Sequence, residues 1–152
     1  MLETPHVVVG AAIATKIPNP YVSIPLAFAS HFVLEKVPHW NPHLNTELGK
    51  YGKVTRKSRV IVTIDATLAL LFGITIASRA LPDTLHFLTI ISACLFSILP
   101  DLVEAPYFFL GYRSERIKKW IGFQKSLQVD WDFLPGTLTQ IITFVAALWW
   151  II

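Results

Sequence analysis

The sequence predicts an all-α integral membrane protein, a single domain over residues 1–152 built as a bundle of four to five helices of which the first is short. Hydrophobic residues make up 53% of the chain and charged residues only 15%, against roughly 25% charged residues in soluble domains. The charges also avoid four long segments, each close to the length of about 18 apolar residues that crosses a bilayer. These segments are 17–34, 60–78 (with Asp65 as its single charge), 84–100 and 133–152.

The first predicted helix covers residues 5–17 and, at about 1.5 Å per residue, is too short to cross a whole bilayer. Two prolines close to Asn19 separate it from a second apolar helix over 21–37, because proline interrupts helical hydrogen bonding. A polar, basic connector over 38–58 follows.

Two long helices form a hairpin in the middle of the chain. The first covers residues 58–79, and Asp83 then offers an N-cap for the second, which extends to Leu99. Pro100 is expected to bend the chain before a shorter apolar segment that continues to Leu110.

A polar, basic segment over 111–132 precedes the last helix, over 135–152. Within it, residues 114–128 place apolar side chains in an arc of about 160° at helical spacing, with lysines opposite. We therefore predict a helix lying on the cytoplasmic leaflet, where lysines meet anionic headgroups; the alternative is a solvated loop. Arg116 and Gln124 interrupt the apolar arc. The arc consists of Ile117, Trp120, Ile121, Phe123 and Leu127, and the lysines are Lys118, Lys119 and Lys125.

Lysine and arginine are distributed unevenly along the chain. Eleven of the 13 lie in the segments 36–59 and 113–125, which the central hairpin places on one side of the membrane. Because basic loops favour the cytoplasmic side, both segments are predicted to be cytoplasmic. This asymmetry also accounts for the net charge of +3 without a nucleic-acid partner.

Polar side chains inside membrane helices are costly, so each needs a partner or a function. With the orientation above, such residues from four separate segments fall into one layer near the cytoplasmic side. His86 lies near the opposite side and is interpreted as a structural or interfacial histidine, whereas His43 belongs either to the layer or to a solvated loop. The layer comprises His6, His31, Glu35, His39, Asp65, Asp101 and Glu104.

The second helix carries the most specific spacing. His31, Glu35 and His39 are four residues apart and share one helical face. A carboxylate between two imidazoles suits zinc, or manganese or iron. Asp101 and Glu104 form a second carboxylate pair, and a divalent cation would offset the negative charge of such buried groups. Each residue alone has a plain structural explanation, whereas the set in one layer favours a functional site.

Three short motifs resemble those of the bacterial inner-membrane metal-dependent hydrolase family, which is similar, more distantly, to zinc-dependent phospholipase C. They are Thr4-Pro5-His6, His31-x-x-x-Glu35-x-x-Pro38-His39 and Leu99-Pro100-Asp101. The resemblance implies location in the bacterial inner membrane and a divalent metal, zinc in the first place. The sequence departs from the family pattern at two points: Glu35 stands where Asp is usual, and no histidine follows His86. The ligands that it implies are His6, His31, Glu35, His39 and Asp101.

The favoured function is therefore a membrane-embedded, metal-dependent hydrolase acting on a phosphoester or lipid at the cytoplasmic leaflet. The metal would polarise the scissile bond and lower the pKa of a bound water, with Glu104 or Asp65 as general base. The alternative is a non-enzymatic membrane protein whose polar layer binds an ion for structure or transport, or contacts a partner subunit or another copy in an oligomer. An open coordination position would favour the enzyme, and four protein ligands a structural site.

Overall fold

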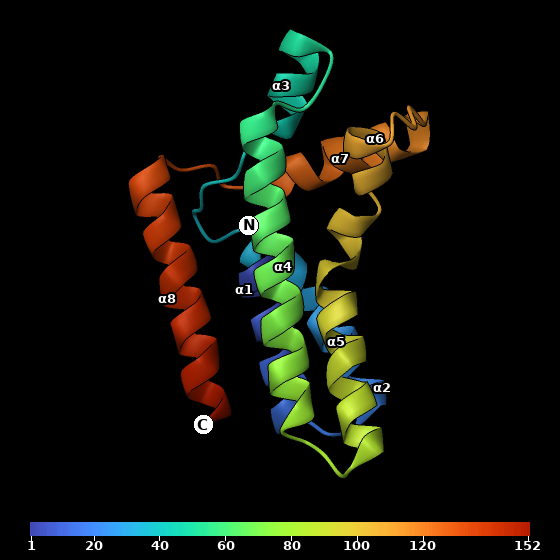
Figure 1. Cartoon of the computed structure of the whole chain (residues 1–152), viewed down its shortest axis with the longest axis vertical. Coiled ribbons are helices and arrows are strands. Elements are labelled where there is room, and N and C mark those ends of the chain that lie inside the picture. Colours follow the sequence, from blue (N-terminus) through green and yellow to red (C-terminus); the bar gives the residue numbers. More distant parts are fainter.

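The computed structural model describes residues 1–152 and is all-helical, as predicted, with eight α-helices in chain order. Three of them are long and apolar enough to cross a membrane, which fits a membrane protein. They are α4 (Arg56–Ser78), α5 (Thr84–Leu102) and α8 (Phe133–Ile151), and they extend in roughly the same direction (Figure 1). A shorter apolar helix, α2 (Pro20–Leu34), lies beside α5.

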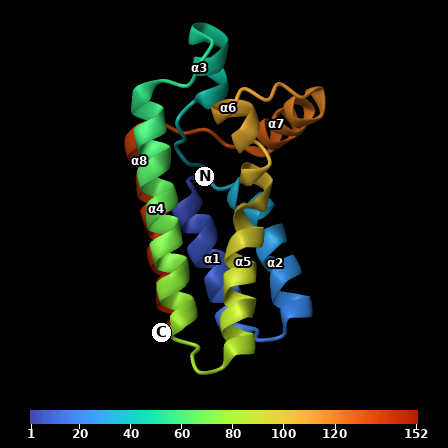
Figure 2. The same ribbon diagram turned by 45° about the vertical axis from the view of Figure 1, so that its right-hand side comes forward.

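The short helix α1 (Glu3–Lys16) occupies the centre of the bundle (Figure 2). It packs against α2, α4, α5 and α8, and most of its residues are buried. Small residues allow this close packing: a Cβ at Gly10 would lie 2.8 Å from the Ala93 carbonyl oxygen of α5. Most of the fully buried core is accordingly alanine, at positions that include Ala11, Ala12 and Ala93.

The central hairpin forms as predicted. Asp83 caps α5 by accepting a hydrogen bond from the His86 backbone N–H at 3.0 Å. Helix α5 continues through Pro100 to Leu102, so the proline lies inside the helix and does not end it. A proline removes only one helical hydrogen bond, and the Trp120 indole donates to the Pro100 carbonyl at 3.0 Å, which helps to hold this last turn.

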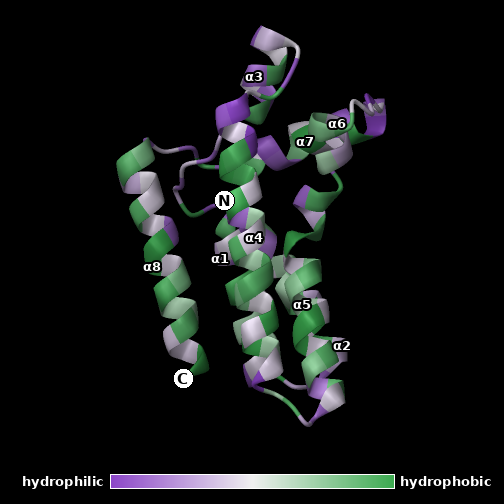
Figure 3. Cartoon of the chain, viewed as in Figure 1, coloured by the Kyte–Doolittle hydropathy of each residue, from purple (hydrophilic) through white to green (hydrophobic).

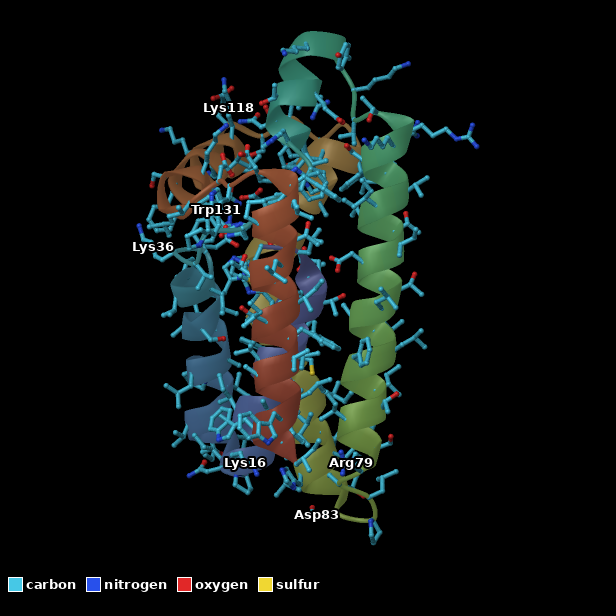
Figure 4. All side chains as sticks on the ribbon, turned by 90° about the vertical axis from the view of Figure 1, so that its left-hand side faces the viewer. Lys16, Lys36, Arg79, Asp83, Lys118 and Trp131 are labelled. Atoms are coloured by element: carbon cyan, nitrogen blue, oxygen red, sulfur yellow. The ribbon has the colours of Figure 1, made fainter.

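Polar residues and three short helices gather at one end of the bundle (Figure 3). These helices are α3 (Leu44–Tyr51), α6 (Ala105–Phe109) and α7 (Glu115–Leu127). The connector 38–58 therefore contains a helix that its polar composition did not predict. The predicted helix over 114–128 is present as α7, which crosses the direction of the long helices (Figure 1) and exposes Lys118, Lys119 and Lys125. Figure 4 shows Lys36 and Lys118 at this end, with Lys16 and Arg79 at the other.

Glu47 anchors α3 to the start of α4. Its carboxylate accepts hydrogen bonds from the Thr55 backbone N–H at 2.8 Å, the Thr55 hydroxyl at 3.0 Å and the Ser58 hydroxyl at 2.7 Å. Partial burial acts to raise the pKa of Glu47, but these hydrogen bonds lower it below its ordinary value overall.

The two basic segments are joined by backbone hydrogen bonds. The His39 N–H donates to the Val129 carbonyl at 3.1 Å, and the Trp131 N–H donates to the His39 carbonyl at 2.9 Å, forming an isolated parallel bridge between His39 and Asp130. The Val129 N–H donates to the Glu35 carbonyl at 3.2 Å. This bridge holds the end of α2 beside the segment that leads into α8.

Candidate metal centre

Two histidines and an aspartate from three helices meet in the interior near the polar end. Ring nitrogens of His6 on α1 and His31 on α2 and a carboxylate oxygen of Asp101 on α5 all lie within 4.8 Å of one another. Both imidazoles are completely buried, and their rings stack with centroids 4.3 Å apart. Histidine nitrogens and a carboxylate oxygen are ordinary ligands for zinc, so this trio is the core of the candidate centre.

Glu35 extends the cluster from His6. Its Oε1 lies 3.3 Å from His6 Nε2 and 3.8 Å from His39 Nε2, and the Met1 amino group also contacts it. The carboxylate is 1% exposed, so these groups replace water around its charge. Glu35 Oε2 and His6 Nδ1 are buried without a hydrogen-bond partner. Both are atoms of the kind that bind metal ions, and no group of the chain bonds to either.

His39 reaches the cluster by a route that the sequence did not predict. Helix α2 ends at Leu34, because Pro38 cannot continue it and the residue before a proline avoids helical geometry. His39 is instead placed by the bridge to Asp130, and its Nδ1 donates to the Val37 carbonyl at 2.7 Å. Burial lowers the pKa of His39, which favours the neutral imidazole that metals bind.

The two nitrogens of His31 both face oxygen acceptors. Nδ1 lies 2.9 Å from the Ser97 carbonyl, and Nε2 lies 3.0 Å from Gln124 Oε1 and 3.7 Å from Asp101 Oδ1. A neutral imidazole donates from only one nitrogen. The second nitrogen, Nε2, therefore requires either a proton of its own or a cation between it and the oxygens.

Gln124 joins the site from α7, which sequence reasoning placed at the membrane surface and outside the polar layer. Its side-chain Nε2 donates to Asp101 Oδ1 at 3.0 Å and to Glu104 Oε1 at 2.9 Å, and the residue is 3% exposed. The signal was present in the sequence as a polar interruption of an apolar helical arc. An inward-facing amide on such an arc is explained once a buried polar cluster lies beneath it.

Glu104 lies between α5 and α6, next to Asp101 through the Gln124 amide. Burial raises its pKa to about 8, against the opposing effect of the hydrogen bond from Gln124. A raised pKa brings this carboxyl group into the range in which it can exchange a proton near neutral pH.

Asp65, the other predicted general base, caps α1. Its two carboxylate oxygens accept hydrogen bonds from the Glu3 backbone N–H at 2.6 Å and from the Thr4 backbone N–H and hydroxyl at 3.2 and 2.7 Å. A carboxylate at this position satisfies N–H groups that a helix start leaves without partners. This explains a buried aspartate in the middle of α4 in structural terms.

The two remaining histidines lie outside the cluster. His43 is exposed and precedes α3. His86 lies near the opposite end of the bundle, where its Nε2 donates to the Ala14 carbonyl at 3.1 Å and links α5 to the end of α1.

An open groove of about 700 Å³ begins beside the cluster. It extends between α4 and α5 over the surface of α1, and most of its lining is apolar. Its polar end includes Glu3, Asp65, Asp101 and Glu104. Of the three converging residues only Asp101 lines the groove, so the groove reaches the edge of the cluster while both imidazoles stay buried.

No family model, curated protein or solved structure matches the chain.

Proposed function

We propose that the chain is a membrane-embedded, metal-dependent hydrolase of a phosphoester or lipid. In this proposal α1 and α2 lie within the bilayer beside the three long helices. The protein belongs to a bacterial cytoplasmic membrane, and the segments 36–59 and 113–125 face the cytoplasm. The candidate centre then lies near the cytoplasmic leaflet, at the end of the bundle where those basic segments gather.

The surroundings of His31 are the observation that carries the proposal. Its Nδ1 is satisfied by the Ser97 carbonyl, whereas Nε2 is directed at oxygens of Gln124 and Asp101. A cation bound between Nε2 and Asp101 would turn this repulsive arrangement into a favourable one. Metal-binding histidines commonly donate their other ring N–H to a backbone carbonyl, as His31 and His39 do.

The donor set fits a divalent transition metal of the zinc type. His6, His31 and Asp101 would hold it, and Glu35 Oε2, which is buried without a hydrogen-bond partner, is a further ligand atom close by. A metal held there would supply a Lewis acid for the phosphoryl or carbonyl oxygen of the substrate. Glu104, whose pKa is raised by burial, would give a proton to a leaving group.

Metal analysis of the purified protein tests the proposal. We expect close to one equivalent of a divalent metal in protein prepared without added metal or chelator, and its loss in His31→Ala and Asp101→Ala. His86→Ala is the matched control, since His86 is also hydrogen-bonded to a backbone carbonyl but at the opposite end of the bundle. Hydrolysis of a phosphoester in the wild type, lost in the same two variants, separates an enzyme from a metal-stabilised protein. Wild-type protein that contains no metal refutes the proposal.

A second candidate function is structural, and one set of contacts favours it. Asp65 caps α1, the Met1 amino group pairs with Glu35, and Gln124 satisfies Asp101 and Glu104. If His31 carries two protons, the cluster is a neutralised polar core that fixes the packing of α1, α2, α5 and α7. The metal analysis above distinguishes this candidate, because it expects no bound metal.

A further inference from the structure

The groove between α4 and α5 has the position and size of a site for a small amphipathic molecule. Its volume of about 700 Å³ falls in the range of roughly 300–1,000 Å³ of small-molecule sites. Leu70, Ile74 and Leu95 line it and are 62%, 48% and 48% exposed. Because both helices are apolar enough to cross a membrane, the groove faces hydrocarbon when they do so.

The apolar part of the groove is as long as one leaflet is deep. On α4 the lining extends from Val62 to Ile74, and on α5 from Ile91 to Leu102. At 1.5 Å per residue these stretches measure about 18 and 17 Å, slightly more than half of a hydrocarbon core of about 30 Å. The groove therefore matches a chain from a single leaflet rather than a helix that spans both.

The polar end of the groove coincides with the candidate metal centre. Asp101 and Glu104 belong to the lining, and Asp101 is also one of the three converging ligands. A molecule with its chain between Leu70 and Leu95 would thus carry its headgroup to Asp101. Lys125 lines the same end and offers a positive charge to an anionic headgroup.

We infer that the groove binds one acyl chain of a membrane phospholipid, with the phosphoester of its headgroup placed at Asp101. The inference rests on the proposed function, since it names the substrate class of that reaction and the direction from which the substrate enters. Lateral entry from the leaflet needs no separate channel, because the groove opens on the surface of the bundle.

Photolabelling in vesicles tests the inference. The protein is reconstituted in phosphatidylglycerol and phosphatidylethanolamine that contain a trace of phosphatidylglycerol with a diazirine in one acyl chain. We expect labels on Leu70, Ile74 and Leu95 to exceed those on the exposed apolar face of α8. The blocking variant is Ala66→Phe, which places a ring in the groove from an exposed position of its lining.

Ala66→Phe should lower labelling of the groove residues about tenfold, the effect of a steric cost within the usual range for an inserted side chain. Thr67→Phe is the matched control, since Thr67 is exposed on α4 and does not line the groove; it should label like the wild type. Equal labelling of the groove and α8, or groove residues shielded from lipid by a second protein, overturns the inference.

The labelling needs neither metal nor turnover, so its outcome is separate from that of the proposed function. Groove labelling without metal-dependent hydrolysis supports the acyl-chain site and counts against the enzyme. Hydrolysis with no preferential labelling of the groove overturns the acyl-chain site and leaves the enzyme standing.

Discussion

Replacing Gln124 by leucine tests whether α7 is held to the bundle by the polar cluster. The substitution keeps a buried side chain of similar size and removes the contacts with His31, Asp101 and Glu104. The three partners differ in their access to water. His31 is completely buried, whereas Asp101 is 24% exposed and Glu104 half-buried.

The expected cost follows from that difference. A buried polar group left without its partner costs about 1–3 kcal/mol, and an ordinary hydrogen bond contributes about 0.5–1.5 kcal/mol. Assigning the larger figure to His31 and the smaller to each of the two carboxyl groups, which water can partly rehydrate, gives about 4 kcal/mol in the free energy of unfolding. For a domain of this size that corresponds to a fall in Tm of about 8–16 °C.

Thermal unfolding in detergent, followed by tryptophan fluorescence, measures the effect. Trp120 lies on α7 and donates to the Pro100 carbonyl, so its share of the emission from the five tryptophans changes if α7 undocks. Gln128→Leu is the control, because Gln128 follows α7 and its side chain has no hydrogen bond within the chain; its Tm should stay within about 2 °C. A Gln124→Leu protein as stable as the wild type would show that the cluster does not hold α7.

Four further predictions concern packing, capping, pH and topology. Gly10→Ala should destabilise the fold by about 2 kcal/mol, because its Cβ would meet a backbone carbonyl of α5; unchanged chemical denaturation would contradict the close α1–α5 packing. Asp65→Ala should cost about 1–2 kcal/mol by leaving the start of α1 uncapped, and Asp65→Asn should recover part of this loss if capping is the cause. The hydrogen bonds to Glu47 lower its pKa, so its stabilising effect is complete above the unfolded pKa of about 4.3 and disappears as the pH falls through the lower folded value. Proteolysis of the α3–α4 junction should accelerate there, and a Glu47→Gln protein with the same pH profile would argue against this carboxylate as the cause. Cysteines near Arg56 and near Lys119 should both be labelled from the cytoplasm, and labelling from opposite sides would invalidate the common polar layer.

The long helices were predictable because their signal is local. Hydrocarbon excludes charge, so the span expected over residues 58–79 differs by two residues at its start and one at its end from the observed α4. The cap at Asp83 was predictable for the same reason, since a capping side chain reaches only to the next turn. The extent of α3 was not, because its anchor is a contact between Glu47 and a residue eleven positions away.

In the candidate site, too, features that depend on nearby residues could be predicted, whereas features that depend on contacts distant in sequence could not. Hydropathy and loop charge predicted a common polar layer, and the structure brings three of its members, His6, His31 and Asp101, together. The position of His39 could not be inferred, because it depends on a bridge to Asp130 rather than on the face of a helix. The contact of Gln124 likewise requires knowing that α7 folds back over the bundle.

The central position of α1 has a consequence for how the protein is made. The helix packs against α2, α4, α5 and α8, and its first turn is capped by Asp65 of α4. Because α1 comes first in chain order, it leaves the ribosome before any of these partners. Until the last helix has been synthesised, some of its buried face lacks a neighbour. Contacts this far apart in sequence form slowly, because a long loop must close before they contribute. A nascent chain stopped before α8 should therefore remain open to membrane proteases and chaperones at α1, however well the central hairpin has already inserted.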